Sequence, residues 1–112
     1  MIDISKLDIK SILKSINNKE ISITELIELY IKKVDKLDKY NLVSEKLYEE
    51  ALLKAKIADQ KKIDERGALE GIPIAVKDIF CTEGNITSAS SNILKNFRSP
   101  YESTVTKNLK EA

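Results

Sequence analysis

Residues 1–66 contain no glycine and no proline, and this most constrains how the chain folds. All three glycines and both prolines lie in residues 67–112. The first part is also more charged, with 27 charged residues in 66 against 10 in the remaining 46. Glycine and proline are the strongest local interruptions of regular structure. We therefore expect an N-terminal helical segment over residues 1–66 and a segment of strands and turns over residues 67–112.

Two helices are predicted at the start of the helical segment. Ile9, Ile12, Leu13 and Ile16 recur on one helical face, and the pair Asn17-Asn18 is expected to end that helix. Ser22-Ile-Thr-Glu25 matches a capping box, in which a hydroxyl and a carboxylate satisfy free amides of the first turn. The second helix should follow it to about Lys39. Its apolar stripe comprises Leu26, Ile27, Tyr30, Val34 and Leu37.

A third helix is expected from about Glu45 to Glu65, with Gly67 as its C-terminal stop. Its buried face would contain Leu47, Ala51, Ala55 and Ala58. The short apolar piece Asn41–Val43, just before it, is compatible with a strand.

The second segment predicts one buried strand and one further helix. Ile74–Val76 is consecutive and apolar, which is typical of a strand covered on both faces, and Pro73 suits its first position. The chain should turn at Gly84, and the hydroxyl-rich Thr87–Ser91 should be a loop or a helix start. A last helix is expected to begin in Ser99–Glu102 with Val105 and Leu109 on one face, and it reaches Ala112 without a stop signal.

Composition narrows the chemistry that is open to the chain. With no histidine, a histidine base or metal ligand is excluded, and the single cysteine excludes an internal disulfide and a cysteine-cluster zinc site. A net charge of +1 argues against a domain devoted to phosphate backbones. The longest apolar run, Ile72–Val76, is far shorter than the roughly 20 residues of a membrane helix. The first six residues lack the features of a signal peptide, so we expect a soluble cytoplasmic protein without membrane contact.

Lys77 is the strongest candidate for a chemical role. It directly follows the predicted buried strand, where desolvation would disfavour the ammonium form and allow the amine to act as a general base. The alternative is that Lys77 marks the strand end and pairs with Asp78 or reaches solvent. Cys81, after Phe80, is expected to be a small core residue. Thr87–Ser91 would either line a polar pocket or cap a helix.

Five motifs in residues 69–112 together resemble the start of an amidase-signature enzyme. The first reads Gly-Ile-Pro-Ile-Ala-Val-Lys-Asp and marks that superfamily. The stretch Asn96–Val105 favours the branch formed by the A subunits of aspartyl/glutamyl-tRNA(Asn/Gln) amidotransferases. Residues 1–66 are similar to that branch in layout and length but carry little motif. The five motifs are Gly71–Asp78, Cys81–Gly84, Thr87–Ser91, Ile93–Phe97 and Pro100–Val105.

The resemblance implies an α/β fold, a mixed central sheet covered by helices. Residues 1–66 would supply its N-terminal helical part, and residues 67–112 would be the truncated start of its core, with the first strand or strands. It also implies a Ser–cis-Ser–Lys triad in which Lys77 is the catalytic base. Both serines of that family lie in a glycine-rich stretch downstream of the lysine, and this chain has no Gly-Gly pair. Ser88, Ser90 and Ser91 align with a hydroxyl-rich segment that plays a supporting part near the site in that family. Asn85-Ile86 replaces the Val-Arg or similar pair that is usual in the family before Thr87.

The activity implied by the resemblance is glutamine hydrolysis inside a heterotrimeric ligase. The A subunit would supply ammonia to the B subunit, which binds ATP and magnesium and amidates Glu-tRNA(Gln) or Asp-tRNA(Asn), while the C subunit bridges the two. The A subunit itself would need no cofactor or metal, and tRNA contact would fall mainly to the B subunit. The 112 residues alone should be inactive. Two alternatives stay open: a stand-alone amidase acting on another amide, and a non-catalytic helical interaction module.

Overall fold

The computed structural model describes residues 8–112. The chain divides into two compact units, Met1–Pro73 and Ile74–Ala112. The described part of the first unit is helical, while the second consists mainly of loops followed by one helix. No helix among the described residues is long and apolar enough to cross a membrane.

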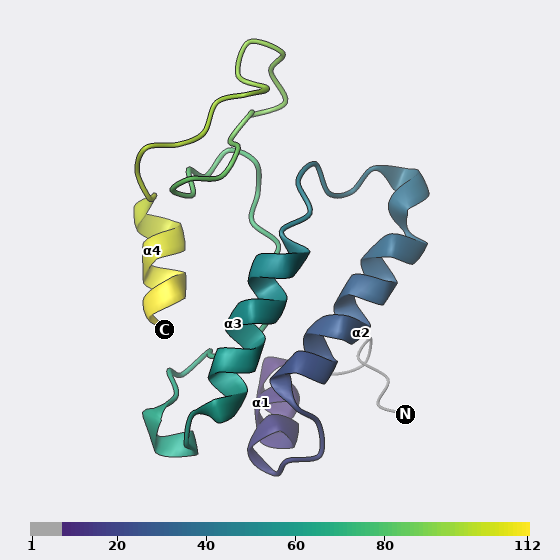
Figure 1. Ribbon diagram of the computed structural model, residues 1–112, viewed down its shortest axis with the longest axis vertical. Coiled ribbons are helices and arrows are strands. Elements are labelled where there is room, and N and C mark those ends of the chain that lie inside the picture. The colour runs from purple at the N-terminus through teal and green to yellow at the C-terminus, as the bar shows by residue number, and fades with distance from the viewer. Residues whose placement is uncertain (1–7) are drawn as a thin grey trace. The chain divides into compact units, whose positions relative to one another are not determined.

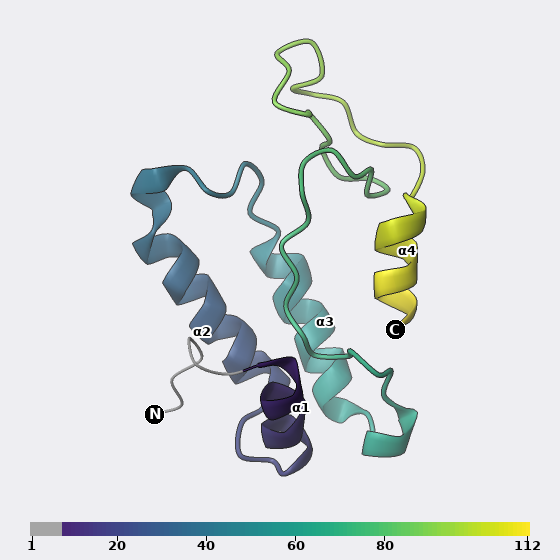
Figure 2. The same ribbon diagram turned by 180° about the vertical axis from the view of Figure 1, so that it is seen from behind.

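Among residues 8–73, the described part of the first unit, there are three α-helices. They are α1 (Ile9–Asn17), α2 (Ile23–Lys36) and α3 (Tyr48–Gln60). Helices α2 and α3 lie side by side and run in opposite directions, as both views along the same axis show (Figure 1 and Figure 2). The connection between them contains a short 3-10 helix, Asp38–Tyr40, and a second one, Ile63–Glu65, follows α3. Residues 8–66, where the sequence predicts a helical segment, thus contain three α-helices and two short 3-10 helices, and the first compact unit extends to Pro73. Residues 1–7 of the predicted segment lie outside the described residues.

The starts of α1 and α2 are set by side chains close in sequence. The Asp8 carboxylate accepts a hydrogen bond from the backbone amide of Ser11 at 2.7 Å. At α2, Ser22 Oγ accepts from the Glu25 amide at 3.1 Å, and Glu25 Oε2 accepts from the Ser22 amide at 2.9 Å. The capping box predicted there is thus confirmed, and it satisfies amides that have no partner inside the helix. The predicted end of α1 is confirmed as well, with Asn18 as its C-cap.

The core of the first unit forms where the three helices meet. Ile23 and Leu26, both on α2, are each only 1% exposed. Ala55 and Ala58 from α3 are also buried, and these small side chains let the backbones of α2 and α3 approach closely. Burial of such apolar surface is the main stabilising term, roughly 25 cal/mol per Å². The buried core residues are Ile12, Ile16, Ile21, Ile23, Leu26, Ile27, Ala55 and Ala58.

Helix α3 is shorter than predicted at both ends, and Gly67 does not stop it. The helix ends at Gln60, because Lys61 adopts an extended conformation (φ −74°, ψ 146°). The Glu70 carboxylate then closes the following segment by accepting from Lys61 Nζ at 2.6 Å and from the Gly67 amide at 3.0 Å. The Lys61–Glu70 contact spans nine residues. Helical patterns relate residues three or four positions apart, so they do not predict this contact. Asn41–Val43, whose composition is compatible with a strand, is irregular, and the described residues contain no strand with which it could pair.

Gly71 returns the chain to this core in a conformation that needs glycine. Its φ is +96°, and a Cβ placed there would lie 2.9 Å from Ile23 Cγ1 and 3.4 Å from Ile16 Cδ1. Glycine therefore permits both the positive φ and the close approach. The next residue, Ile72, packs against the core.

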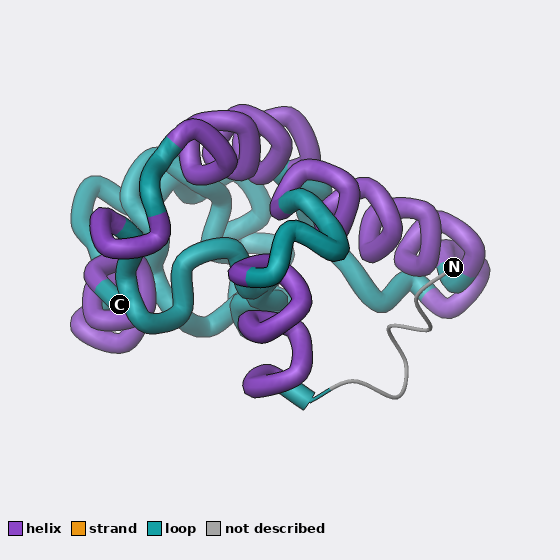
Figure 3. Tube along the Cα trace, turned by 90° about the horizontal axis from the view of Figure 1, so that it is seen from below, coloured by secondary structure: helices purple, strands orange, loops and turns teal. Residues whose placement is uncertain are grey.

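The second unit has little regular structure. Its helix, α4, is Thr104–Glu111, and Ser103 caps it by accepting from the Thr106 amide at 3.3 Å. The expected last helix is confirmed, although it begins two residues after the expected segment and its buried residue is Thr106 rather than Val105 or Leu109. Figure 3 shows helices in purple and loops in teal, with no strand in the part of the chain that is described.

The strand predicted at Ile74–Val76 is absent from the described structure. These residues are irregular, and Ile74 and Val76 are 47% and 45% exposed rather than buried on both faces. A β-strand forms only when its amides and carbonyls find a neighbouring strand. None of the described residues pairs with Ile74–Val76, so the apolar run alone does not produce a strand.

Candidate active-site lysine and the adjoining loop

Lys77 lies in the irregular segment that opens the second unit, and it is exposed. The expectation that it is buried at the end of a strand is therefore wrong for the described residues, for the same reason that the strand is absent. Its backbone carbonyl accepts a hydrogen bond from the Phe80 amide at 3.0 Å, which closes a turn immediately after it. That turn restrains the backbone at Lys77. Separately, the Lys77 amine forms no ion pair within residues 8–112.

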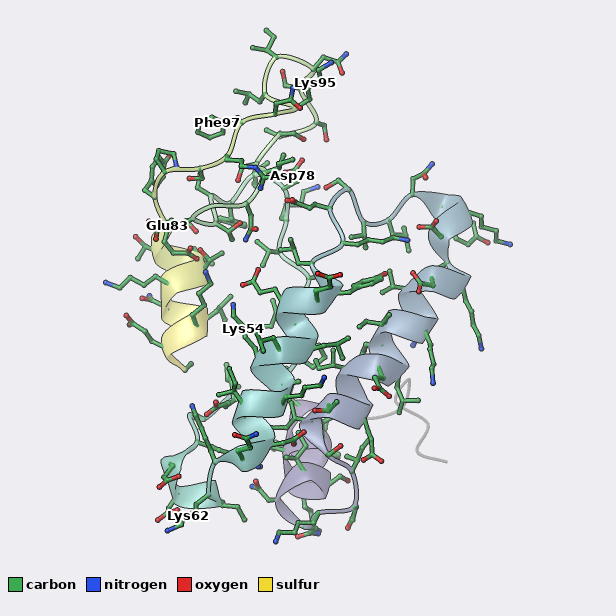
Figure 4. The ribbon with its side chains drawn as sticks, viewed as in Figure 1. Lys54, Lys62, Asp78, Glu83, Lys95 and Phe97 are labelled. Carbon is green, nitrogen blue, oxygen red and sulfur yellow. The ribbon has the colours of Figure 1, made fainter. Side chains whose placement is uncertain are left out.

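Asp78 binds the hydroxyl-rich loop rather than Lys77. Its Oδ1 accepts from the Ser88 amide at 2.8 Å, and its Oδ2 accepts from the Ser88 hydroxyl in a short contact. The Asp78 carbonyl also accepts from the Ala89 amide at 2.9 Å. The structure therefore brings together the residue beside Lys77 and the loop that the sequence indicated. Figure 4 labels Asp78 and draws the side chains around it.

The carboxylate of Asp78 is held in its charged form by these contacts. The Ser88 hydroxyl, and then the Ser88 amide, lower the pKa of Asp78, while partial burial opposes them. Hydrogen bonds to an ionised acceptor are stronger than bonds between neutral groups. Asp78 therefore acts as a charged anchor for Ser88.

The loop is strained just beyond this anchor. Ala89 and Ser90 have positive φ angles of 48° and 58°, a conformation that residues with a side chain adopt at a cost. Two local bonds stabilise it: the Ser90 amide donates to Ser88 Oγ at 3.3 Å, and the Ser91 amide donates to the Ser88 carbonyl at 2.8 Å. Thr87–Ser91 is therefore a loop and not a helix start.

Two antiparallel segments frame this loop. Ile86 and Arg98 form an isolated antiparallel bridge, and the Thr87 amide donates to the Phe97 carbonyl at 3.0 Å. The turn expected at Gly84 is present, with φ +78°, and the Gly84 carbonyl accepts from Arg98 Nη1 at 2.9 Å. These bonds close the ends of the 87–97 segment.

Cys81 is half-buried rather than a full core residue. Its thiol donates to the Tyr101 hydroxyl at 3.4 Å. The hydroxyls of Tyr101 and then Ser99 lower the pKa of Cys81, while burial raises it. The Cys81 carbonyl accepts from the Ser103 amide at 2.8 Å, so this residue ties the segment after Lys77 to the start of α4.

A second carboxylate strengthens the same connection. Glu102 Oε2 accepts from the Glu83 amide at 2.8 Å and from Lys110 Nζ at 2.9 Å. Thr106, Lys110 and the Glu83 amide together lower the pKa of Glu102 to about 2. Figure 4 shows Glu83 beside the beginning of α4. Among the described residues, no group of three or more His, Cys, Asp and Glu side chains is arranged to hold a metal ion.

Sequence reasoning missed the partnership between Asp78 and Ser88. The sequence indicates Asp78 only as a possible ion-pair partner of Lys77, and Ser88 only as part of a run of hydroxyl side chains. The two residues are ten positions apart, which is beyond the reach of helix or turn patterns. The usable signal was an acid next to a candidate base, followed at loop distance by a cluster of hydroxyls.

Comparison of the amino-acid sequence with known proteins shows similarity over almost the whole chain. The A subunits of glutamyl-tRNA(Gln) amidotransferases from several bacteria match 110 residues, which is 97% of this chain. The protein from Pelagibacter ubique is 44% identical, that from Rickettsia bellii (strain OSU 85-389) 41%, and that from Parvibaculum lavamentivorans 39%. The matched region spans 22% of the length of these relatives.

A family model described as Amidase matches residues 25–112. That range includes most of the helical unit, Lys77, Asp78, the hydroxyl-rich loop and α4. The resemblance inferred from the five sequence motifs is thereby confirmed, and the chain belongs to the amidase family.

Proposed function

We propose that the chain is the N-terminal part of the A subunit, the glutamine-hydrolysing component, of a tRNA-dependent amidotransferase. The observation that carries this proposal is the identity of 39–44%, over 97% of the chain, to proteins with that name. The intact enzyme would release ammonia from glutamine for the amidation of Glu-tRNA(Gln) or Asp-tRNA(Asn). Its partners would be the B and C subunits, with ATP, magnesium and most tRNA contact assigned to the B subunit.

In this proposal Lys77 is the catalytic base. It would accept a proton through a bridging serine from a nucleophilic serine, both supplied by the rest of the intact protein. The serine oxygen attacks the side-chain amide carbon of glutamine, the carbon–nitrogen bond breaks, and ammonia leaves with the transferred proton. Water then hydrolyses the acyl-enzyme to glutamate and regenerates the serine. A lysine at the head of a closed turn, with an amine that no described carboxylate binds, suits this role.

The proposal extends to the fold and the setting of the intact protein. Ile74–Val76 would become a strand of the mixed central sheet when further strands of the protein pair with it, which would bury Ile74 and Val76. The adjoining Lys77 would then lie at the edge of a site from which water is excluded. The free thiol of Cys81 suits the reducing cytoplasm, where this reaction would take place.

The test is Lys77→Ala in the full-length protein, in complex with its partners. We expect ammonia release from glutamine to be lost, whereas amidation supplied with ammonium chloride continues, because it bypasses the glutaminase step. Lys95→Ala is the matched control, since Lys95 is another exposed lysine of the same unit (Figure 4). Near-normal glutamine turnover in Lys77→Ala would overturn the assignment. Turnover of an amide without association with the B and C subunits would favour a stand-alone amidase instead.

A further inference from the structure

Three hydrogen bonds join residue 78 to residues 88 and 89. Asp78 contributes both carboxylate oxygens and its backbone carbonyl, while Ser88 contributes its amide and hydroxyl and Ala89 its amide. Asp78 and Ser88 are both partly buried. We call this set of contacts the Asp78–Ser88 latch. It directly connects the segment containing Lys77 to the hydroxyl-rich loop.

The latch fixes Lys77 from its C-terminal side. Asp78 follows Lys77 directly, so a bound Asp78 side chain and carbonyl leave little freedom in the intervening peptide. The Phe80 amide donates to the Lys77 carbonyl at 3.0 Å, which restrains the same peptide group a second time. The direction in which the Lys77 side chain leaves the backbone is therefore set by these contacts.

The latch also holds the loop in a costly conformation. Ala89 and Ser90 have positive φ, and such residues persist only where surrounding contacts determine them. Ser88, which precedes them, is bound by Asp78, and the Ala89 amide is bound by the Asp78 carbonyl. Strain of this kind is concentrated at functional sites, where it serves pre-organisation.

Because Asp78 binds Ser88, it does not form an ion pair with Lys77. A carboxylate next to a lysine can pair with it and thereby hold the ammonium form. Here both carboxylate oxygens of Asp78 accept from Ser88, and Lys77 forms no ion pair with any described residue. The latch therefore engages the neighbouring carboxylate with Ser88 rather than with the candidate base.

We propose that Asp78 and Ser88 are positioning residues of the amidase reaction, which hold Lys77 and the 87–91 loop in the geometry that proton transfer requires. This inference rests on the proposed role of Lys77 as the base. It assigns the two residues no contact with substrate. Their effect is on the chemical step, because a displacement of about 1 Å in a catalytic group costs on the order of 100-fold in rate.

The experiment uses the full-length protein in complex with its partners and measures ammonia release from glutamine. Ser88→Ala and Asp78→Ala should each lower kcat by about 10- to 100-fold and leave KM for glutamine nearly unchanged, since an interaction needed only in the transition state is lost. The double variant should be no slower than the worse single variant, because the two residues act as one unit. Ser88→Thr and Asp78→Asn, which keep a hydroxyl or an acceptor, should recover much of the rate.

Glu102→Gln is the matched control, because Glu102 also bridges two segments of this unit but has no contact with Lys77, Asp78 or Ser88. It should loosen the unit without a selective loss of kcat, and its effect should add to that of Ser88→Ala. Full kcat in both Ser88→Ala and Asp78→Ala, together with an inactive Lys77→Ala, would overturn the proposed positioning role of the latch. The assignment of Lys77 as the base would still stand. An equal loss of kcat in Glu102→Gln would also overturn the positioning role. So would losses of kcat from Ser88→Ala and Asp78→Ala that add up in the double variant. An active Lys77→Ala would instead overturn the proposed function.

Discussion

The Asp59 carboxylate on α3 caps the start of α2 through Thr24. Its Oδ2 accepts from the Thr24 amide at 2.9 Å and from the Thr24 hydroxyl at 2.7 Å, and its Oδ1 accepts from the Ile23 amide at 2.8 Å. The N-terminus of α2 is thus satisfied twice, locally by the capping box and across the helix pair by Asp59. Because the carboxylate is negative, it also suits the positive end of the α2 dipole.

Asp59→Ala should destabilise the helical unit by about 1–2 kcal/mol. Two backbone amides and a partly buried hydroxyl would lose their partner, and the typical loss of an N-cap lies in this range. Hydrogen exchange at the Ile23 and Thr24 amides should speed up. Asp64→Ala, at an exposed acidic residue just after α3, serves as the control and should leave both amides unchanged. Unchanged exchange in Asp59→Ala would contradict the interhelical cap.

Gly71→Ala should cost more stability than Gly84→Ala. Both glycines have positive φ, but a Cβ at Gly71 meets Ile23 Cγ1 at 2.9 Å, whereas a Cβ at Gly84 meets nothing within 4 Å. We expect a loss of about 3 kcal/mol at Gly71, from strain together with overpacking, and about 1 kcal/mol at Gly84 from strain alone. Denaturant unfolding of the two variants compares their free energies of unfolding. Equal losses of stability would show that the Ile23 side chain moves aside for the added Cβ at little energetic cost.

Acid should loosen the connection between Glu83 and α4. The pKa of Glu102 is lowered from 4.5 to about 2 in the folded chain, so its ionised form stabilises the folded state. That contribution is present above pH 4.5 and is lost as the pH falls toward about 2. The protection of the Glu83 amide, the factor by which its hydrogen exchange is slower than that of an unfolded chain at the same pH, should therefore fall through this window in the native protein. In Glu102→Gln, which cannot ionise at this position, the protection should not change across the same window. Glu111→Gln, at an exposed i,i+4 pair with Lys107, should keep the native profile.

The 112-residue chain alone should release no ammonia from glutamine. It contains the proposed base but no Gly-Gly pair, and so it lacks the glycine-rich stretch in which the nucleophilic serine and oxyanion donors are expected. Ammonia measured above the background of a Lys77→Ala chain would show that serines within these residues can act. The assay therefore tests whether Lys77 is sufficient for ammonia release without the two serines of the proposed triad.

Local patterns in the sequence predicted the helical elements well. The capping box at Ser22 and the end of α1 at Asn18 depend on residues three or four positions apart, and both are present. The end of α3 was misplaced because the segment after it is closed by Glu70, nine residues beyond Lys61. Asp59 was not recognised as a cap for the same reason, since it lies 35 residues from Thr24.

The candidate site shows the same division between local and distant information. Motif similarity identified Lys77 as the candidate base and Thr87–Ser91 as a supporting hydroxyl segment. It did not show that Asp78 holds that loop, because this requires knowing how the chain folds back over ten residues. The strand at Ile74–Val76 failed for a different reason: an apolar run reports a preference for burial, but strand formation also requires a partner strand.

The helical unit has its core residues within a short stretch of chain, and this bears on how the protein is synthesised. Its buried core runs from Ile12 to Ala58, with Ile72 packed against it, so every contribution has been translated by residue 73. Domains generally fold as units during synthesis, beginning from the N-terminus. The three described helices are therefore able to pack together at the ribosome while the segment containing Lys77, the proposed base, is still being synthesised.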